Sequence, residues 1–213
     1  MTSNRTILAG ALLLALAPLA VAAAAAQEAK PKEAKPQEAG KEKSAEAPAD
    51  KTYKSKSPRF QVTAPADKAW DFLADESAQK TFLVPRYKGR CVTFFHDVAG
   101  KKDILEVSIT AIDKKEAEFD KLVATYKGNL EDHFSDTKIF EVNDKAKFKG
   151  KKATSFKVEG RLKQSEGVVL VLESYVFEHK EHLMLFEVAA DGPATREKYK
   201  KDLVEIEKSL RFL

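Results

Sequence analysis

The stretch VVLVLESYVFEHKEHLMLFEVA, residues 168–189, decides the fold predicted for this chain. It contains two strand candidates, Val168–Phe177 and Leu183–Ala189, which are rich in branched and aromatic side chains. Only the polar connection from His179 to His182 separates them, so the two strands are expected to form an antiparallel hairpin. Because Val168–Leu172 is apolar on both faces, its strand should lie inside a sheet that is covered on both sides.

Shorter strand patterns extend this hairpin into a larger sheet. Short segments with apolar and branched residues, several of them alternating apolar with polar positions, predict a strand at each of five further places. These strand candidates are residues 60–63, 91–95, 104–112, 138–142 and 153–162.

Two helices are expected to pack on the sheet. The longer one begins at Asp113 as its N-cap, and apolar residues follow at steps of three and four along one face. That face consists of Phe119, Leu122, Val123, Tyr126, Leu130 and Phe134. After the break at residues 191–193, Thr195 is expected to cap the final helix. The inner face of that helix consists of Tyr199, Leu203, Ile206 and Leu210.

A helical turn is also predicted at residues 67–74, with Trp70 and Leu73 facing inward. The order of elements predicts an α+β fold, in which an antiparallel sheet carries one long internal helix and a C-terminal helix.

The N-terminal quarter of the chain has a different character. Arg5 precedes an apolar run, Ile7–Ala26, that ends in small residues, which is the pattern of an export signal. The signal is predicted to span residues 1–26, and it could be cleaved or kept as an anchor. Residues 27–57 contain no branched aliphatic side chain and one aromatic residue, so we expect a disordered Lys/Glu/Ala/Pro linker. Residues 58–213 then form a single domain.

Several short motifs resemble a known family. They are Phe60-x-Val62-x-x-Pro65 near the front, Gly150-Lys151-Lys152-Ala153 opening a strand, a strand bearing Tyr175 and Phe177, and Ile206 to Phe212 at the end. With the element order, they resemble the PsbP-like family, whose fold is shared with Mog-type Ran-binding proteins. The resemblance covers most of residues 58–213. It implies a Mog/PsbP-like sandwich in an exported, non-enzymatic assembly or binding module, and no functional residue carries over from it.

Catalytic motifs are absent from the sequence. There is no phosphate-binding loop, no dinucleotide fingerprint and no Gly-x-Ser-x-Gly elbow, so we predict no catalytic residue, no cofactor and no enzyme activity. The single cysteine excludes an internal disulfide, and a formal charge of +4 does not suggest nucleic-acid binding.

Two weaker possibilities for chemistry stay open. His179 and His182 could bind a metal ion weakly, although solvated turn residues are the simpler interpretation, and no metal site is predicted. Cys91 could pair with His96 or His133 as a thiolate, or it could be a buried inert thiol.

The best candidate binding residues lie between the first predicted helical turn and the next strand. Arg86, Tyr87, Lys88 and Arg90 form a basic stretch that could hold a carboxylate, a phosphate or an acidic partner. The alternative is a charged strand edge that prevents aggregation. Trp70 could line a ligand cleft, or it could pack in the core.

These observations predict a non-enzymatic binding or assembly module of the cell envelope, tethered by a flexible linker. The protein should be exported to the periplasm or the extracellular space, with no nucleic-acid partner and no membrane insertion of the mature domain. Its partner would be an envelope protein or a small ligand. The alternative is a small-ligand carrier with an apolar cavity between sheet and helix.

Overall fold

A computed structural model describes residues 51–66, 69–80, 88–96, 104–163 and 167–213, all within one compact unit that spans Ala47–Leu213. The elements in chain order are β1 (Thr52–Lys56), β2 (Arg59–Thr63), β3 (Trp70–Lys80), β4 (Lys88–His96), β5 (Leu105–Asp113), α1 (Phe119–His133), β6 (Phe134–Phe148), β7 (Lys151–Leu162), β8 (Val169–His179), β9 (His182–Asp191), α2 (Gly192–Lys198), α3 (Lys200–Ser209) and β10 (Arg211–Phe212).

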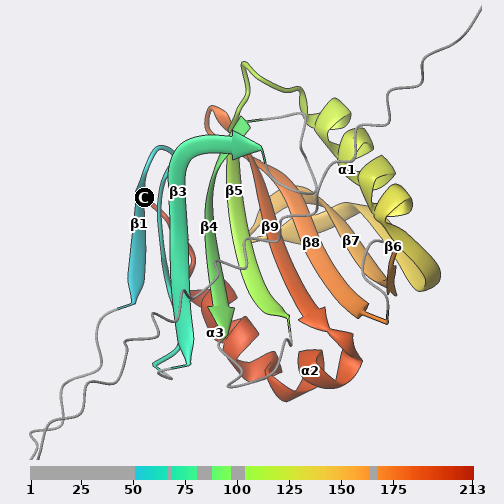
Figure 1. The fold of residues 1–213 in the computed structure, drawn as a ribbon. Coiled ribbons are helices and arrows are strands. Elements are labelled where there is room, and N and C mark those ends of the chain that lie inside the picture. The colour runs from blue at the N-terminus through green and yellow to red at the C-terminus, as the bar shows by residue number, and fades with distance from the viewer. Residues whose placement is uncertain (1–50, 67–68, 81–87, 97–103, 164–166) are drawn as a thin grey trace, which may run out of the picture. The chain divides into compact units, whose positions relative to one another are not determined.

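The larger sheet confirms the predicted α+β class. Its seven strands run antiparallel in the order β3-β4-β5-β9-β8-β7-β6, as Figure 1 shows. The predicted hairpin of β8 and β9 is confirmed, with His179 opposite His182 at its turn. Strand β8 lies between β9 and β7, and Leu170, Val171 and Leu172 are all buried, as expected for a strand covered on both faces.

A smaller sheet joins the two ends of the described chain. Strand β2 pairs on one side with β1 and on the other with β10. Strand β1 lies inside the segment predicted as a linker, so the folded part begins by Thr52 and the predicted start at residue 58 is too late. The sequence shows no apolar strand pattern here, because only Tyr53 and Ser55 of the five residues are buried. The predicted signal and the rest of the linker lie outside the described residues.

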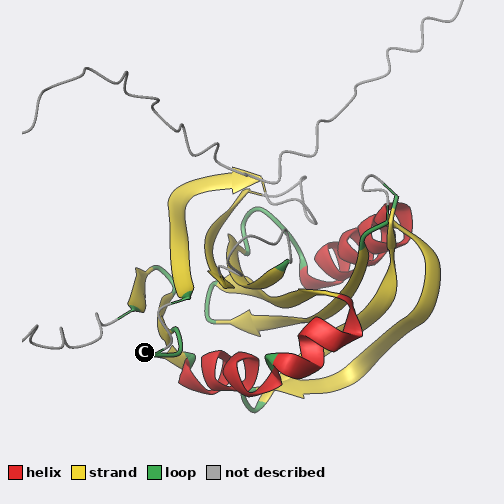
Figure 2. Ribbon diagram, turned by 60° about the horizontal axis from the view of Figure 1, so that its bottom comes forward, coloured by secondary structure: helices red, strands yellow, loops and turns green. Residues whose placement is uncertain are grey.

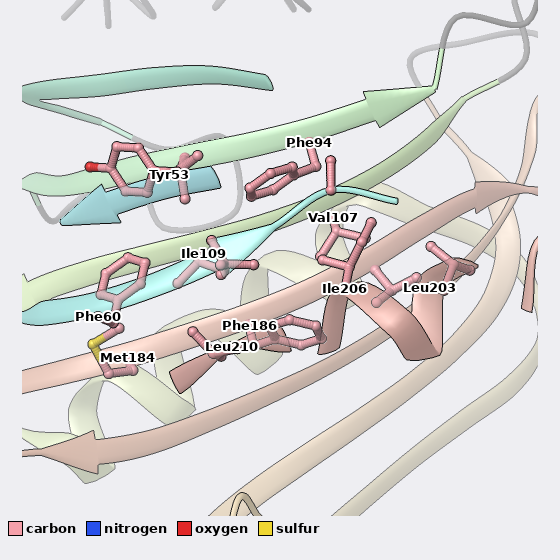
Figure 3. Close-up of a cluster of buried hydrophobic side chains, with 14 of the residues drawn as sticks. Tyr53, Phe60, Phe94, Val107, Ile109, Met184, Phe186, Leu203, Ile206 and Leu210 are labelled. Carbon is pink, nitrogen blue, oxygen red and sulfur yellow. The ribbon is translucent and has the colours of Figure 1, made fainter. Parts of the chain in front are cut away.

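The first half of the core joins the small sheet and α3 to one face of the large sheet. Phe60 from β2 and three aliphatic residues of the α3 segment, Leu203, Ile206 and Leu210, belong to the same buried cluster as Phe186, which Figure 3 shows. These side chains are at most 3% exposed. Each fully buried side chain of this size contributes about 1.5–3 kcal/mol relative to exposure, so this cluster fixes α3 and β2 on the sheet.

The second half of the core lies under α1, on the opposite face of the large sheet. Figure 2 shows α1 on one side of the sheet and α2 with α3 on the other. Leu122, Tyr126 and Leu130 are fully buried and confirm the predicted apolar face of α1. They pack with β7 and β8 residues such as Phe156 and Val176.

The predicted helical turn at residues 67–74 is wrong, because β3 begins at Trp70. Trp70 is fully buried, whereas Leu73 is 66% exposed. Residues three apart point to opposite faces of a strand but share a face of a helix, so this difference in burial follows from the strand conformation.

Neither of the two residues predicted as helix N-caps occupies that position. Asp113 ends β5, where its Oδ1 accepts a hydrogen bond of 2.8 Å from the Lys115 amide and so stabilises a turn, and α1 begins only at Phe119. Thr195 lies inside α2, which the sequence analysis merged with α3 into one helix. The short β10 that follows was not predicted. Within the described residues, no helix is both long enough and apolar enough to span a bilayer.

Candidate functional site

The basic stretch proposed for binding is only partly described. Arg86 and Tyr87 lie outside the described residues. Lys88 and Arg90 belong to β4 by backbone pairing, with Arg90 opposite Ala111 of β5, and their side chains lie outside the described part of the structure. Anion binding by these residues therefore stays a prediction.

Trp70 is a core residue. Its indole ring is fully buried, Nε1 donates a hydrogen bond of 3.2 Å to Oδ2 of Asp202 in α3, and the ring meets the edge of His96 at a centroid distance of 5.3 Å. This geometry fits core packing, and it leaves the ring without the exposure that contact with a ligand in an open cleft requires.

Of the two hairpin histidines, His179 is buried. His179 is only 6% exposed, and its ring stacks on Phe212 of β10 at 4.3 Å, so the expected solvated position is wrong for this residue. Burial lowers the pKa of His179, and the charges of Lys151 and Lys180 lower it further. In the described part of the chain, no three His, Cys, Asp or Glu side chains come together as ligands of a metal ion.

The two histidines proposed as partners of Cys91 lie on different faces of the large sheet. His96 stacks with Tyr199, beside α3, at 4.5 Å, whereas His133 ends α1 on the opposite face. The Cys91 side chain lies outside the described part, so its pairing with either histidine stays a prediction.

A groove of about 200 Å³ lies on β6, β7 and β8. Alternate residues of a strand point to the same face of a sheet. Each of the three strands lines the groove with one pair of such residues. Its lining consists of Glu141, Asn143, Ser155, Phe156, Lys157, Glu173 and Tyr175. The polar pairs on β7 and β8 follow the same face as Ala153 and Phe177, which belong to the core cluster beneath α3.

Tyr175 is one of the two aromatic residues that line this groove, and the core holds its ring in place. Its centroid lies 4.7 Å from that of Phe148, which in turn stacks against Phe177 at 5.0 Å and Phe186 at 4.9 Å. Burial raises the pKa of Tyr175, and Glu207 and Glu173 raise it further. The hydroxyl is therefore protonated at neutral pH and can both donate and accept a hydrogen bond.

An ion pair holds Glu173, one of the lining residues, in place. Arg196 of α2 places Nη2 2.7 Å from Oε2 of Glu173, and both side chains are largely buried, at 18% and 31% exposure. The remaining lining residues offer a hydroxyl, an amide, an ammonium and a carboxylate from neighbouring strands. Ser155 has no histidine beside it among the lining residues, so the groove has the chemistry of hydrogen-bonded recognition and lacks an activated nucleophile.

A separate polar cluster is buried under α1. The Tyr126 hydroxyl donates a hydrogen bond of 2.8 Å to Oε1 of Glu187, and the fully buried Ser174 lies opposite Glu187 in the sheet. Burial raises the pKa of Glu187 to about 7; the Tyr126 hydrogen bond opposes this rise, and the charge of Glu106 adds to it. Sequence analysis missed this cluster, although Glu187 is the only charged residue within the apolar run Leu183–Ala190.

The space between α1 and the sheet is filled in the described structure. The Tyr126 ring meets that of Phe156 at 5.0 Å, and Leu122 and Leu130 beside it are fully buried. The apolar cavity that a small-ligand carrier would need is therefore occupied by side chains at this interface.

No family model and no curated protein sequence matches the chain. The structure is similar to the solution structure of cyanobacterial PsbP (CyanoP) from Synechocystis, with 10% sequence identity and a TM-score of 0.47, over 82% of this chain and 98% of that chain. It is also similar to the Saccharomyces cerevisiae Ran-binding protein Mog1p, with 5% identity and a TM-score of 0.43, over 78% of this chain and 96% of that chain.

A third similar structure is LpqN, involved in cell envelope biogenesis of Mycobacterium tuberculosis, with 12% identity and a TM-score of 0.42, over 71% of this chain and 82% of that chain. The two kinds of protein that the sequence resemblance named, PsbP and Mog1, are thus both among the solved structures to which this chain is similar.

Proposed function

We propose that this protein is a non-enzymatic binding module of the cell envelope, and that the groove on β6–β8 receives a polar segment of an envelope protein. The groove carries this proposal because its polar side chains stand on three paired strands. Side chains on a rigid sheet recognise a partner with a small entropic cost.

The size and position of the groove favour a protein segment as the ligand. A volume of about 200 Å³ corresponds to about seven water molecules, which suits one or two side chains of a partner. Strand β6 is the edge of the large sheet, and Val142 on it is 38% exposed. A partner that reaches Tyr175 in the groove can therefore also contact the backbone of this edge.

The export part of the proposal rests on the sequence that precedes β1. The apolar run after Arg5 provides the address, and the Lys/Glu/Ala/Pro composition before β1 provides a flexible tether. Cell fractionation with N-terminal sequencing of the recovered chain tests this part separately. A chain recovered only from the cytoplasm would contradict it.

Site-specific photo-crosslinking in the producing cells tests the groove. A photoreactive residue at Ser155 should give an adduct of defined mass, whereas the same residue at Lys121, on the outer face of α1, should give none. Adding Tyr175→Ala should reduce the adduct from position 155, with circular dichroism showing that the variant is folded. Equal adducts from both positions, or none from position 155, would contradict the proposed site.

A further inference from the structure

Six basic residues gather at one end of the domain, which we call the cationic end. They are Arg59, Lys149, Lys151, Lys180, Lys208 and Arg211. The sheet register explains the gathering. Lys151 begins β7 opposite Phe148, and Ala153 lies opposite Phe177 near the end of β8, so the β6–β7 and β8–β9 turns come to the same end of the sheet.

Hydrogen bonds and one cation–π contact connect these residues through the C-terminal segment that follows α3. Lys149 Nζ donates a hydrogen bond of 3.3 Å to the Lys208 carbonyl, and Lys180 Nζ donates one of 2.9 Å to the Leu213 carbonyl. Lys151 Nζ lies 5.3 Å from the centroid of the Phe212 ring. The Leu213 amide donates a 3.0 Å hydrogen bond to the Arg59 carbonyl, which brings the turn before β2 to the same place.

Acidic residues such as Glu207 lie near the cationic end, but no acidic side chain forms an ion pair with its six basic residues in the described structure. Glu207 raises the pKa of Lys149, but burial is the largest effect and lowers it, and Arg211 and Lys208 lower it as well. Unpaired like charges repel one another and do not stabilise the fold.

The kind of cation indicates the kind of partner. Four of the six are lysines, and five of the six residues are exposed, with Lys151 half-buried. A lysine ammonium is a flexible point charge, unlike the arginine fork that matches a single carboxylate or phosphate in a fixed geometry. Point charges spread over the end of a domain suit an array of anionic groups, as lipid headgroups provide.

We propose that the cationic end docks this domain peripherally on an anionic lipid surface. This surface is distinct from the groove, whose polar residues lie farther along β7 and β8, at Ser155–Lys157 and Glu173–Tyr175. Docking of this kind uses headgroup charge and needs no insertion of the domain into the bilayer.

Vesicle flotation with the exported chain tests the inference. Wild-type protein should float with vesicles that contain phosphatidylglycerol and phosphatidylcholine at low salt, and it should not float with pure phosphatidylcholine. Binding should weaken steeply at about 0.5 M salt, because the Debye length then falls to a few ångströms.

The decisive comparison uses two triple variants with the same loss of charge. K149Q/K180Q/K208Q should bind on the order of 100-fold more weakly, at about five-fold for each cation removed from the surface. The matched control, K121Q/K127Q/K138Q, removes three lysines that each pair with a glutamate elsewhere and should change binding by less than about three-fold.

Both triple variants keep the N-terminal segment, so any membrane contact of that segment cancels in the comparison. Thermal melts establish that they are folded. Equal losses in both variants would overturn the inference, because they would indicate a general charge effect. The inference would also be overturned if the wild-type protein did not bind the vesicles at all. It would be overturned as well if millimolar glycerol phosphate abolished binding, because that result would indicate a site for soluble phosphate.

Discussion

Replacing Glu187 by glutamine should stabilise the folded protein above pH 7 and have little effect near pH 4.5. Burial under α1 raises the pKa of this carboxyl from its ordinary value of 4.5 to about 7, so folding disfavours its ionised form. The resulting cost is absent below pH 4.5, grows as the pH rises towards 7, and is complete above it. At about 1.4 kcal/mol per pKa unit, the cost at pH 8 is about 3 kcal/mol.

Urea unfolding followed by circular dichroism at pH 5 and pH 8 measures this effect. The free energy of unfolding of Glu187→Gln should exceed that of the wild type by about 3 kcal/mol at pH 8 and by less than about 1 kcal/mol at pH 5. Glutamine keeps an oxygen that can accept the Tyr126 hydrogen bond, so the substitution removes the charge and little else. Glu141→Gln, at an exposed position on β6, is the matched control and should change little at either pH.

Other groups titrate in the same range, so the difference between variant and wild type at each pH is the quantity to compare. Burial also raises the pKa of Glu106, and it lowers the pKa of His133 and His179. Their contributions largely cancel in that difference, apart from the Glu106 charge that acts directly on Glu187. If Glu187→Gln gives the same difference at pH 5 and pH 8, the buried carboxyl does not titrate as argued.

Three further predictions test the packing. Tyr126→Phe removes the hydroxyl that donates a hydrogen bond to Glu187, and it should lower the free energy of unfolding by about 1–3 kcal/mol. The loss should be larger at pH 8 than at pH 5, and a loss that is independent of pH in urea titrations would contradict this prediction. Trp70→Ala should lower it by about 3–5 kcal/mol in the same assay, whereas a loss below about 1 kcal/mol would mean that the ring is not buried as described. Ile206→Ala should lower the free energy of unfolding by about 2–5 kcal/mol, whereas Glu205→Ala on the exposed face of α3 should lower it by less than about 0.5 kcal/mol. Similar melting curves for the two variants would argue against the docking of α3 on the sheet.

Strong local patterns predicted the main elements of the fold. The hairpin of β8 and β9 and the buried face of α1 are confirmed because the spacing of their apolar residues fixes which side each strand or helix buries. Strands β3 and β10 lack such a pattern. Trp70 opens β3 opposite His96 of β4, and the two residues of β10 pair with the distant strand β2, so both strands are recognised only through their partners.

The candidate binding surfaces were less predictable than the fold. The groove is lined by one pair of side chains from each of three strands. A single segment such as Glu173–Tyr175 does not reveal in the sequence that the pairs of the other two strands lie beside it. The sequence leaves Trp70 open between a ligand cleft and the core, because an aromatic side chain gives the same signal in both places. Its burial and its hydrogen bond to Asp202, 132 residues away, decide for the core.

By itself, the sequence determined the composition of the N-terminal segment, the periodicity of the strands and helices, and the apolar faces that must be buried. Those properties depend on residues a few positions apart, and the alternation of side chains along the backbone expresses them directly. Three features appear only once the chain is folded: Glu187 is enclosed under Tyr126, the groove forms on β6–β8, and the basic residues of separate turns share one end. The reason is physical: burial, desolvation and electrostatic repulsion depend on distances across the sheet, and strand register sets those distances.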